Sequence, residues 1–208
     1  MSIALFSTSY IPSISWISSF SLFQDLKIEQ YENYKKQTYR NRCHIYSANG
    51  LLPLIVPVNK TSGNHTLLKD IAIDYSLNWP INHVRSIEAA YNRTPYYLHY
   101  KDFLDVVLQK KHHYLVDLNC ELLEAIMKIL HLQQTDFQLT ERFAKVHEND
   151  FRDTIHPKKE ILELLTRAEY YQPFSHKYGF IPDLSIIDLI FNLGPDASKY
   201  IKNLAPKL

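Results

Sequence analysis

The order of the sequence patterns limits the fold of this chain more than any other feature. Short strand-like runs are concentrated in residues 1–75, and apolar residues at helical spacing fill residues 79–204. Residues 3–6 form a continuous apolar run, which is typical of a strand buried on both faces. No long linker or internal repeat divides the chain. The sequence therefore predicts an α/β or α+β fold with a single domain over residues 1–208, in which a small mixed sheet from the N-terminal third is covered by helices from the C-terminal two thirds.

A β-hairpin over residues 43–56 is the clearest local prediction. Two strand-like arms flank Asn49 and Gly50, and both of these residues tolerate the positive φ of a tight turn. We expect this hairpin to pair with two further strands in one sheet and to be covered by two helices. The expected strands are residues 3–6 and 71–73, and the expected helices are residues 80–91 and 185–193.

The helical part of the chain carries start and stop signals. Ser185 and Asp188 have the spacing of a capping box at the start of an apolar helix, and Gly194 is placed to end it. Residues 133–159 are polar and give no clear pattern. A further strand is expected at residues 26–29, and further helices are expected at residues 12–23, 97–108, 118–132, 161–165 and in a last segment to residue 204.

Charge and hydropathy exclude several classes of partner. The chain has 23 Lys and Arg against 22 Asp and Glu, so it has no electrostatic footprint for nucleic acid. No stretch reaches the ~18 uninterrupted apolar residues of a membrane span. The apolar start, residues 3–23, has no basic residue before it and no small-x-small cleavage pattern, so a signal peptide is not expected. Cys43 and Cys120 are far apart and are expected to be free thiols, which favours the cytoplasm.

Cofactor and metal motifs are missing from the sequence. The chain has only 4 Gly, and neither G-x-G-x-x-G nor a P-loop occurs. Its 10 His include no H-x-x-x-H or H-E-x-x-H spacing, and the adjacent His112 and His113 would point apart on a helix. We therefore expect no cofactor and no metal site.

Residues 35–42 hold four cations in eight residues, directly before the predicted hairpin. An Arg side chain presents a fork that suits phosphate or carboxylate, and a neighbouring Tyr can stack on a base or a sugar. The alternative is a solvated edge strand that charge protects from aggregation. As residues that bind a small anionic substrate, the run offers Lys36, Tyr39, Arg40, Asn41 and Arg42.

His83 is the candidate for acid–base chemistry, because the pKa of a free His lies near physiological pH. Its position on the helical wheel is at the border of the apolar stripe formed by Ile81, Val84, Ile87 and Tyr91. A border position permits both substrate access and a fixed tautomer. It equally permits a structural His that is hydrogen-bonded to a carbonyl.

Two further places could contact a substrate. Asp150, Arg152 and His156 lie together in a loop-like stretch, which is either a site component or a salt-bridged surface loop. Ser185 precedes a helix, so it either caps that helix or helps to bind an anion there. Cys43 follows Arg42 and could act as a nucleophile, although a Cys in a strand is more often part of the core.

The chain contains a series of sequence blocks at residues 10–12, 28–34, 36–43, 47–50, 56–58, 69–71, 78–79, 83, 86–87, 90–92, 150–152, 155–158, 170–172 and 179–195. These blocks are spread over nearly the whole chain and resemble the WbqC-like family, particularly a short form associated with Bacteroidetes. Two features depart from the family pattern: Ser7-Thr8 stands where many members have Gln-Pro, and a segment that precedes the final helices of longer members is missing. The resemblance implies an accessory of surface-polysaccharide or O-antigen gene clusters, and transfer of an amino acid such as glycine to a sugar.

Two functions from different classes follow. The first is a transferase that adds an acyl or aminoacyl group to a sugar or sugar nucleotide, and the second is a non-catalytic binding partner of a polysaccharide biosynthetic enzyme. Clustering of Tyr39, Arg42 and His83 in one cleft would favour the transferase. A flat Tyr-rich patch, together with a buried His83 bonded to a carbonyl, would favour the binding protein. Neither a monomer nor a homo-oligomer is excluded.

Overall fold

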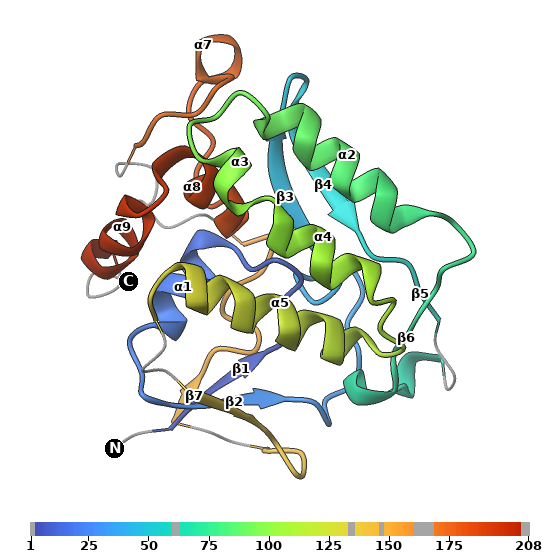
Figure 1. Cartoon of the computed structure of the whole chain (residues 1–208). Coiled ribbons are helices and arrows are strands. Elements are labelled where there is room, and N and C mark those ends of the chain that lie inside the picture. The colour runs from blue at the N-terminus through green and yellow to red at the C-terminus, as the bar shows by residue number, and fades with distance from the viewer. Residues whose placement is uncertain (1–2, 60–62, 133–135, 146–147, 160–168, 205–208) are drawn as a thin grey trace.

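A four-stranded parallel sheet forms the base of the protein, as the computed structural model in Figure 1 shows. The structure describes residues 3–59, 63–132, 136–145, 148–159 and 169–204. The strand order is β7-β2-β1-β8. The strands are β1 (Ala4–Ser7), β2 (Asp25–Glu29), β7 (Asp136–Leu139) and β8 (Asn149–Asp150).

β1 is the buried centre of this sheet, as its apolar run predicts. All four of its residues are buried, and β2 and β8 pair with its two edges. Helix α1 (Ile14–Phe20) leads from β1 to β2, and the Ser13 hydroxyl accepts a hydrogen bond from the Trp16 amide in its first turn. The rings of Trp16 and Phe20 lie 5.1 and 5.2 Å from the Phe6 ring, so α1 is fixed to the sheet by aromatic contacts.

The predicted hairpin forms, but the prediction that it shares one sheet with the strands at residues 3–6 and 71–73 is wrong. β3 (Arg42–Ser47) and β4 (Gly50–Ile55) make a separate two-stranded antiparallel sheet. Both edges of β1 are already occupied, so no edge is left for the hairpin. At the turn only Gly50 has a positive φ, of 91°, and Asn49 does not. β5 (Val58–Asn59) and β6 (Ala72–Ile73) form another small antiparallel pair.

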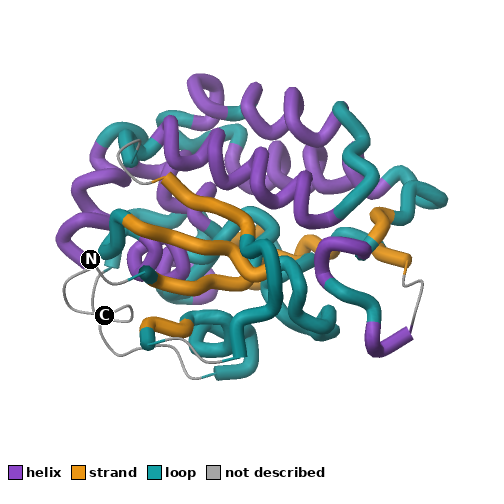
Figure 2. Tube along the Cα trace, turned by 90° about the horizontal axis from the view of Figure 1, so that it is seen from below, coloured by secondary structure: helices purple, strands orange, loops and turns teal. Residues whose placement is uncertain are grey.

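Helices fill the C-terminal part as predicted, and the longer ones gather on one side of the strands (Figure 2). α2 and α8 contact β3, so the hairpin is covered by the two expected helices. The expected helix at residues 97–108 is two helices, α3 and α4, and the one at residues 161–165 lies outside the described residues. The remaining bounds are η1 (Gly63–His65), η2 (Leu68–Asp70), α2 (Trp79–Tyr91), α3 (Tyr97–Tyr100), α4 (Asp102–Gln109), α5 (Leu115–Ile129), α7 (Ser175–Tyr178), α8 (Ile186–Leu193) and α9 (Asp196–Leu204).

The predicted capping box at the start of α8 is wrong, although the helix begins where the prediction places it. The Ser185 hydroxyl donates a hydrogen bond to the Ile11 carbonyl instead, over 2.9 Å, and makes no cap. Gly194 ends α8 with a φ of 54°, as its position predicts. A Cβ at this glycine would lie 2.4 Å from the ring of Tyr96, so the close approach of that ring also requires glycine.

Within the described ranges, no helix is long and apolar enough to cross a membrane. Cys43 and Cys120 are free thiols, and burial raises the pKa of both. Cys43 is fully buried in the core face of β3, and this argues against the nucleophile interpretation.

Candidate functional site

The order of the parallel strands marks one end of the sheet as a ligand site. If the four strands are renumbered 1 to 4 in the order in which they occur in the chain, their order across the sheet is 3-2-1-4. This is the order of the first four strands in doubly wound α/β folds. In such sheets ligands bind outside the carboxyl ends of the strands, where the order reverses. Here the reversal lies between β1 and β8, so the relevant strand ends are Ser7, Glu29 and Asp150.

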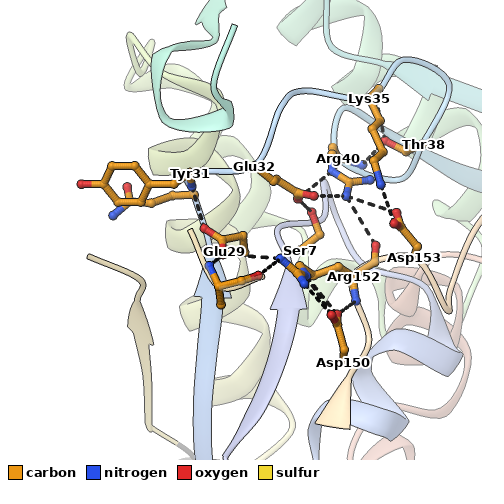
Figure 3. Close-up of polar contacts among 12 residues, drawn as sticks. Ser7, Glu29, Tyr31, Glu32, Lys35, Thr38, Arg40, Asp150, Arg152 and Asp153 are labelled. Atoms are coloured by element: carbon orange, nitrogen blue, oxygen red, sulfur yellow. Dashed lines mark hydrogen bonds and ion pairs between the residues drawn. The ribbon is translucent and has the colours of Figure 1, made fainter. Parts of the chain in front are cut away.

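A pocket of ≈510 Å³ lies at these strand ends, and we call it the charged pocket. Figure 3 shows its side chains beyond the ends of β1 and β2, with Arg40 between Glu32 and Asp153, and Arg152 between Glu29 and Asp150. The lining contains three acidic and three basic side chains, so its charges are balanced. The lining residues are Glu32, Asn33, Lys35, Phe143, Asp150, Arg152, Asp153, Thr154 and Lys159.

Arg40 and Glu32 form a buried, bidentate ion pair at the back of this pocket. Arg40 Nε and Nη2 donate to Glu32 Oε1 and Oε2 over 3.0 and 2.7 Å, and only 3% of the Arg40 side chain is exposed. The Ser7 hydroxyl also donates to Glu32 Oε1. The Nη2 group lies 3.7 Å from Asp153, which itself forms an ion pair with Lys35. Arg40 is therefore paired within the protein, and this favours a structural contribution over direct substrate binding.

Arg152 connects the loop after β8 to the other strand ends. Its Nε and Nη2 donate to the two carboxylate oxygens of Asp150 over 2.9 and 2.5 Å, and its Nη1 donates to the Ala144 carbonyl over 2.8 Å. The same Nη1 lies 3.6 Å from Oε2 of the fully buried Glu29. Its guanidinium also lies over the ring of Phe143, 5.2 Å from the centroid. The ring of Phe143 is half exposed and forms an apolar wall of the pocket.

A second pocket of ≈460 Å³ adjoins the charged pocket, and we call it the histidine pocket. The two pockets share Thr154 and Lys159. The lining is mainly apolar with a few polar groups, as is usual for small-molecule sites of about 300–1,000 Å³. Its other residues are Ser15, Ser19, Leu22, Tyr39, His44, Leu51, Phe151, Ile155, His156, Pro157, Ile181, Pro182, Asp183 and Leu184.

His44 and His156 bring acid–base chemistry to this pocket. Burial lowers the pKa of His44, and the charge of Arg42 acts in the same direction, so the ring is neutral near pH 7. Among the described residues its imidazole has no hydrogen-bond partner, although its ring contacts that of Tyr39. Burial also lowers the pKa of His156, whose Nδ1 accepts the Lys158 amide hydrogen bond over 3.1 Å. The neutral ring of His156 therefore carries its proton on Nε2.

Asp183 fixes one wall of the histidine pocket in an uncommon backbone conformation, with a φ of 52°. Its carboxylate accepts hydrogen bonds from the Ser15 amide and hydroxyl over 2.8 and 2.9 Å, at the first turn of α1. Burial raises the pKa of Asp183 to about 6 in spite of these donors. The contact fixes the segment before α8 to the helix that follows β1.

The predicted site residues are divided among three pockets and the buried interior. The charged pocket contains Asp150 and Arg152, with Arg40 behind it, and the histidine pocket contains Tyr39 and His156. A third pocket of ≈320 Å³ contains Lys36, Asn41 and Arg42. His83 and Ser185 are buried, at 6% and 1% exposure. The cluster of Tyr39, Arg42 and His83 that would favour a transferase is therefore not formed.

The prediction that His83 lies at the border of α2 is wrong. The helix buries Trp79, His83 and Ile87, whereas Ile81 is 45% exposed, so the buried face is turned relative to the predicted stripe. Nδ1 of His83 lies 2.9 Å from the hydroxyl of Tyr10, and the ring also bonds to the backbone of Ile55. Burial lowers its pKa to about 4. These are the contacts of a neutral structural histidine, and its catalytic contribution stays a prediction.

Sequence reasoning missed the carboxylates that pair with the predicted cations. Glu29 and Glu32 are buried at the strand ends, and His44 lines the histidine pocket. One signal was available: Ser7 follows a buried apolar run and Glu29 ends the next strand candidate, and the ends of parallel strands meet at one edge. His44 had no such signal, because a His in a hairpin arm alternates with apolar residues in many surface strands.

Fold and pockets together define an α/β protein whose parallel sheet has candidate ligand pockets at its carboxyl edge. The chain belongs to the WbqC-like protein family, whose family model matches residues 8–173. It is similar along nearly its full length to the "Uncharacterized protein Rv1507c" of Mycobacterium tuberculosis, with 26% identity over 231 aligned positions that cover 96% of this chain and 97% of the relative. No solved structure matches the chain.

Proposed function

We propose that the protein is a cytoplasmic transferase that adds an acyl or aminoacyl group to a sugar or sugar-nucleotide precursor of a surface polysaccharide. The observation that carries this proposal is the position of the two adjoining pockets at the strand-order reversal of a parallel sheet. Two substrates must meet in a transfer reaction, and two pockets that share Thr154 and Lys159 can bring them together.

The charged pocket has the groups that a sugar or a zwitterionic amino acid needs. The carboxylates of Asp150 and Asp153 can accept hydrogen bonds from hydroxyl or ammonium groups, and the ring of Phe143 offers an apolar wall for a sugar face. Lys159 can donate to a phosphate or carboxylate. A balanced lining suits a substrate that carries both signs of charge.

The histidine pocket has the groups for proton transfer. During acyl transfer the acceptor oxygen or nitrogen bonds to the acyl carbon, the bond from that carbon to the donor's leaving group breaks, and the acceptor proton must be removed. Neutral His44 takes this proton and then returns it to the leaving group. His156 donates from Nε2 to the oxyanion that develops on the acyl oxygen. His83 takes no part in this scheme.

Incubation with nucleotide sugars and with acyl-CoA or aminoacyl-adenylate donors, followed by mass spectrometry, tests the proposal. We expect a sugar product that gains the mass of the acyl group. His44→Asn is expected to lower the rate by about 100-fold or more at unchanged stability. His99→Asn, on the exposed face of α3, is the matched control and keeps the wild-type rate. A full rate in His44→Asn would contradict the assigned chemistry.

A non-catalytic binding protein is the second candidate, and the buried, backbone-bonded His83 favours it. Such a protein would use the same pockets to hold a precursor for a partner enzyme. It would bind nucleotide sugars in a thermal-shift or calorimetric measurement without forming a product. Binding with unchanged affinity in His44→Asn, together with no product in the wild type, would select this candidate.

A further inference from the structure

The third pocket differs from the other two in the ion pairing of its cations, and we call it the Arg42 pocket. It measures ≈320 Å³ and shares no lining residue with the charged pocket or the histidine pocket. Its position is at the start of β3, beside the beginning of β5. The lining residues are Tyr34, Lys36, Gln37, Asn41, Arg42 and Val58.

Neither cation of the Arg42 pocket forms an ion pair with a described residue. In the part of the chain that the structure describes, Lys36 and Arg42 have no carboxylate partner. Arg40, only two positions before Arg42, forms a bidentate pair, and Lys35 pairs with Asp153. In the run at residues 35–42, Lys35 and Arg40 are therefore neutralised by carboxylates, whereas the positive charges of Lys36 and Arg42 are available to a ligand.

Two buried polar atoms of this pocket also have no partner within the described residues. One is Nε of the half-buried Arg42, a charged donor. The other is Oδ1 of Asn41, a side chain that is only 6% exposed and whose Nδ2 donates to the Val56 carbonyl over 2.8 Å. An unsatisfied buried polar group is costly, so a ligand that satisfies both atoms would stabilise the site.

We propose that the Arg42 pocket is an oxyanion site for inorganic phosphate or the terminal phosphate of a phosphorylated ligand. The unprotonated oxygens accept hydrogen bonds from the guanidinium of Arg42 and the ammonium of Lys36. A P–OH group of the phosphate monoanion donates to Asn41 Oδ1. Sulfate has the same shape and charged oxygens but carries no such hydroxyl at neutral pH, so it leaves the amide oxygen unsatisfied.

The pKa of His44, which lies on the same strand as Arg42, can report whether the site is occupied. Side chains alternate along a strand, so Arg42 and His44 lie on one face of β3, opposite Ile55 and Pro53 of β4. Burial is the largest cause that lowers the pKa of His44, and the positive charge of Arg42 is the second. A phosphate on Arg42 cancels this charge locally, so the pKa of His44 rises when the site is filled. This inference does not depend on the proposed transferase, since phosphate binding needs no turnover.

NMR of the histidine Cε1–H signals of the whole protein tests the inference, with inorganic phosphate as the probe. His44→Asn assigns the signal. We expect millimolar phosphate to raise the pKa of His44 in a saturable way, and sulfate to bind more weakly. Arg42→Ala should weaken phosphate binding by between about 10-fold and about 100-fold, because charge-assisted hydrogen bonds are lost. Lys36→Ala should weaken it less.

Arg85→Ala, on the exposed face of α2, is the control and leaves phosphate binding unchanged. Arg42→Lys retains the charge without the fork, so it separates general attraction from the proposed geometry and is expected to bind weakly. Uridine diphosphate distinguishes the source of the phosphate: tighter binding that still needs Arg42 assigns a phosphorylated ligand, and equal binding assigns free phosphate. An unshifted His44 at saturating phosphate, or full binding by Arg42→Ala in a folded protein, would overturn the proposal. Loss of transferase activity alone would not.

Discussion

Tyr91 donates a hydrogen bond from its hydroxyl to Oδ1 of Asp188 over 2.8 Å, and neither residue is exposed. Tyr170 donates to the other carboxylate oxygen, and Gln172 Nε2 lies 3.2 Å from it. Burial nevertheless raises the pKa of Asp188 to about 6. This carboxylate links α2, α8 and the segment at residue 170, so its protonation is coupled to the stability of the core.

Asp188→Asn is expected to alter the pH dependence of stability. The folded-state pKa of Asp188 is about 6 and the reference pKa is 3.8, so the folded protein holds this proton more tightly than the unfolded chain. Stability from this source is present below about pH 4 and is lost as the pH rises to about 6. The free energy of unfolding of the wild type relative to the variant should fall by about 3 kcal/mol over that range. Urea unfolding at a series of pH values measures it.

Asp136→Asn, at an exposed position of β7, is the control for this series. Its free energy of unfolding should depend on pH in the same way as that of the wild type. A constant difference between wild type and Asp188→Asn would contradict the raised pKa of Asp188.

Removing one partner of the Arg40–Glu32 pair should destabilise the protein strongly. Arg40→Met leaves Glu32 buried and unpaired, and breaking a buried ion pair usually costs about 3–5 kcal/mol. The double variant Glu32→Leu with Arg40→Met removes both charges and should regain a large part of this loss. Chemical denaturation of the two single variants and the double variant gives the coupling energy. Additive losses would mean that the two charges act independently.

His83→Asn should lower stability, as expected for a core histidine. The variant loses the contact to Tyr10 and the ring packing on Trp79, and a lost buried hydrogen bond costs about 1–3 kcal/mol. The wild-type pKa of about 4 lies below the reference value of 6.5, so stability from His83 is present above about pH 6.5 and is lost as the pH falls to about 4. Thermal unfolding at neutral and acidic pH checks both points. Unchanged stability with lost turnover would return His83 to the catalytic residues.

Gly194→Ala should destabilise the protein more than Gly50→Ala. Both glycines have a positive φ, so both variants carry a backbone penalty of about 1–2 kcal/mol. At Gly194 the new Cβ would meet the ring of Tyr96, whereas at Gly50 no described residue other than its chain neighbours lies within 4 Å of it. The difference between the two variants in the midpoint of thermal unfolding measures the steric contribution. Adding Tyr96→Ala to Gly194→Ala should reduce that contribution, and no reduction would assign the whole effect to the backbone.

The sequence predicted those elements whose signal is local. The apolar run of β1, the arms of the hairpin and the stripe of α8 each determine their own structure. The partner of a strand is not a local property. Nothing near Cys43 records that β2 and β8 occupy both edges of β1, so the single-sheet prediction failed. β8 is only two residues long, and its polar sequence has no strand pattern.

The candidate site was predicted in part. The sequence selected Arg40, Asp150 and Arg152, which lie around the charged pocket, but it gave no sign that Glu32 pairs with Arg40. A run of cations looks alike whether its charges are paired or available, because pairing depends on residues that are distant along the chain. The error at His83 has a simpler cause: Trp79 determines the buried face of α2, and the predicted stripe began with Ile81 instead.

The pairing of Ala4 with Asn149 has a consequence for synthesis on the ribosome. β1 leaves the exit tunnel long before β8 is made, so one apolar edge of β1 stays open in the nascent chain for most of translation. An open, apolar strand edge is a template for misassembly with other chains. Residues 148–159 close this edge and also contribute to both pockets, so protection from such pairing and formation of the ligand sites depend on the same late segment. Residues 181–184 then complete the histidine pocket.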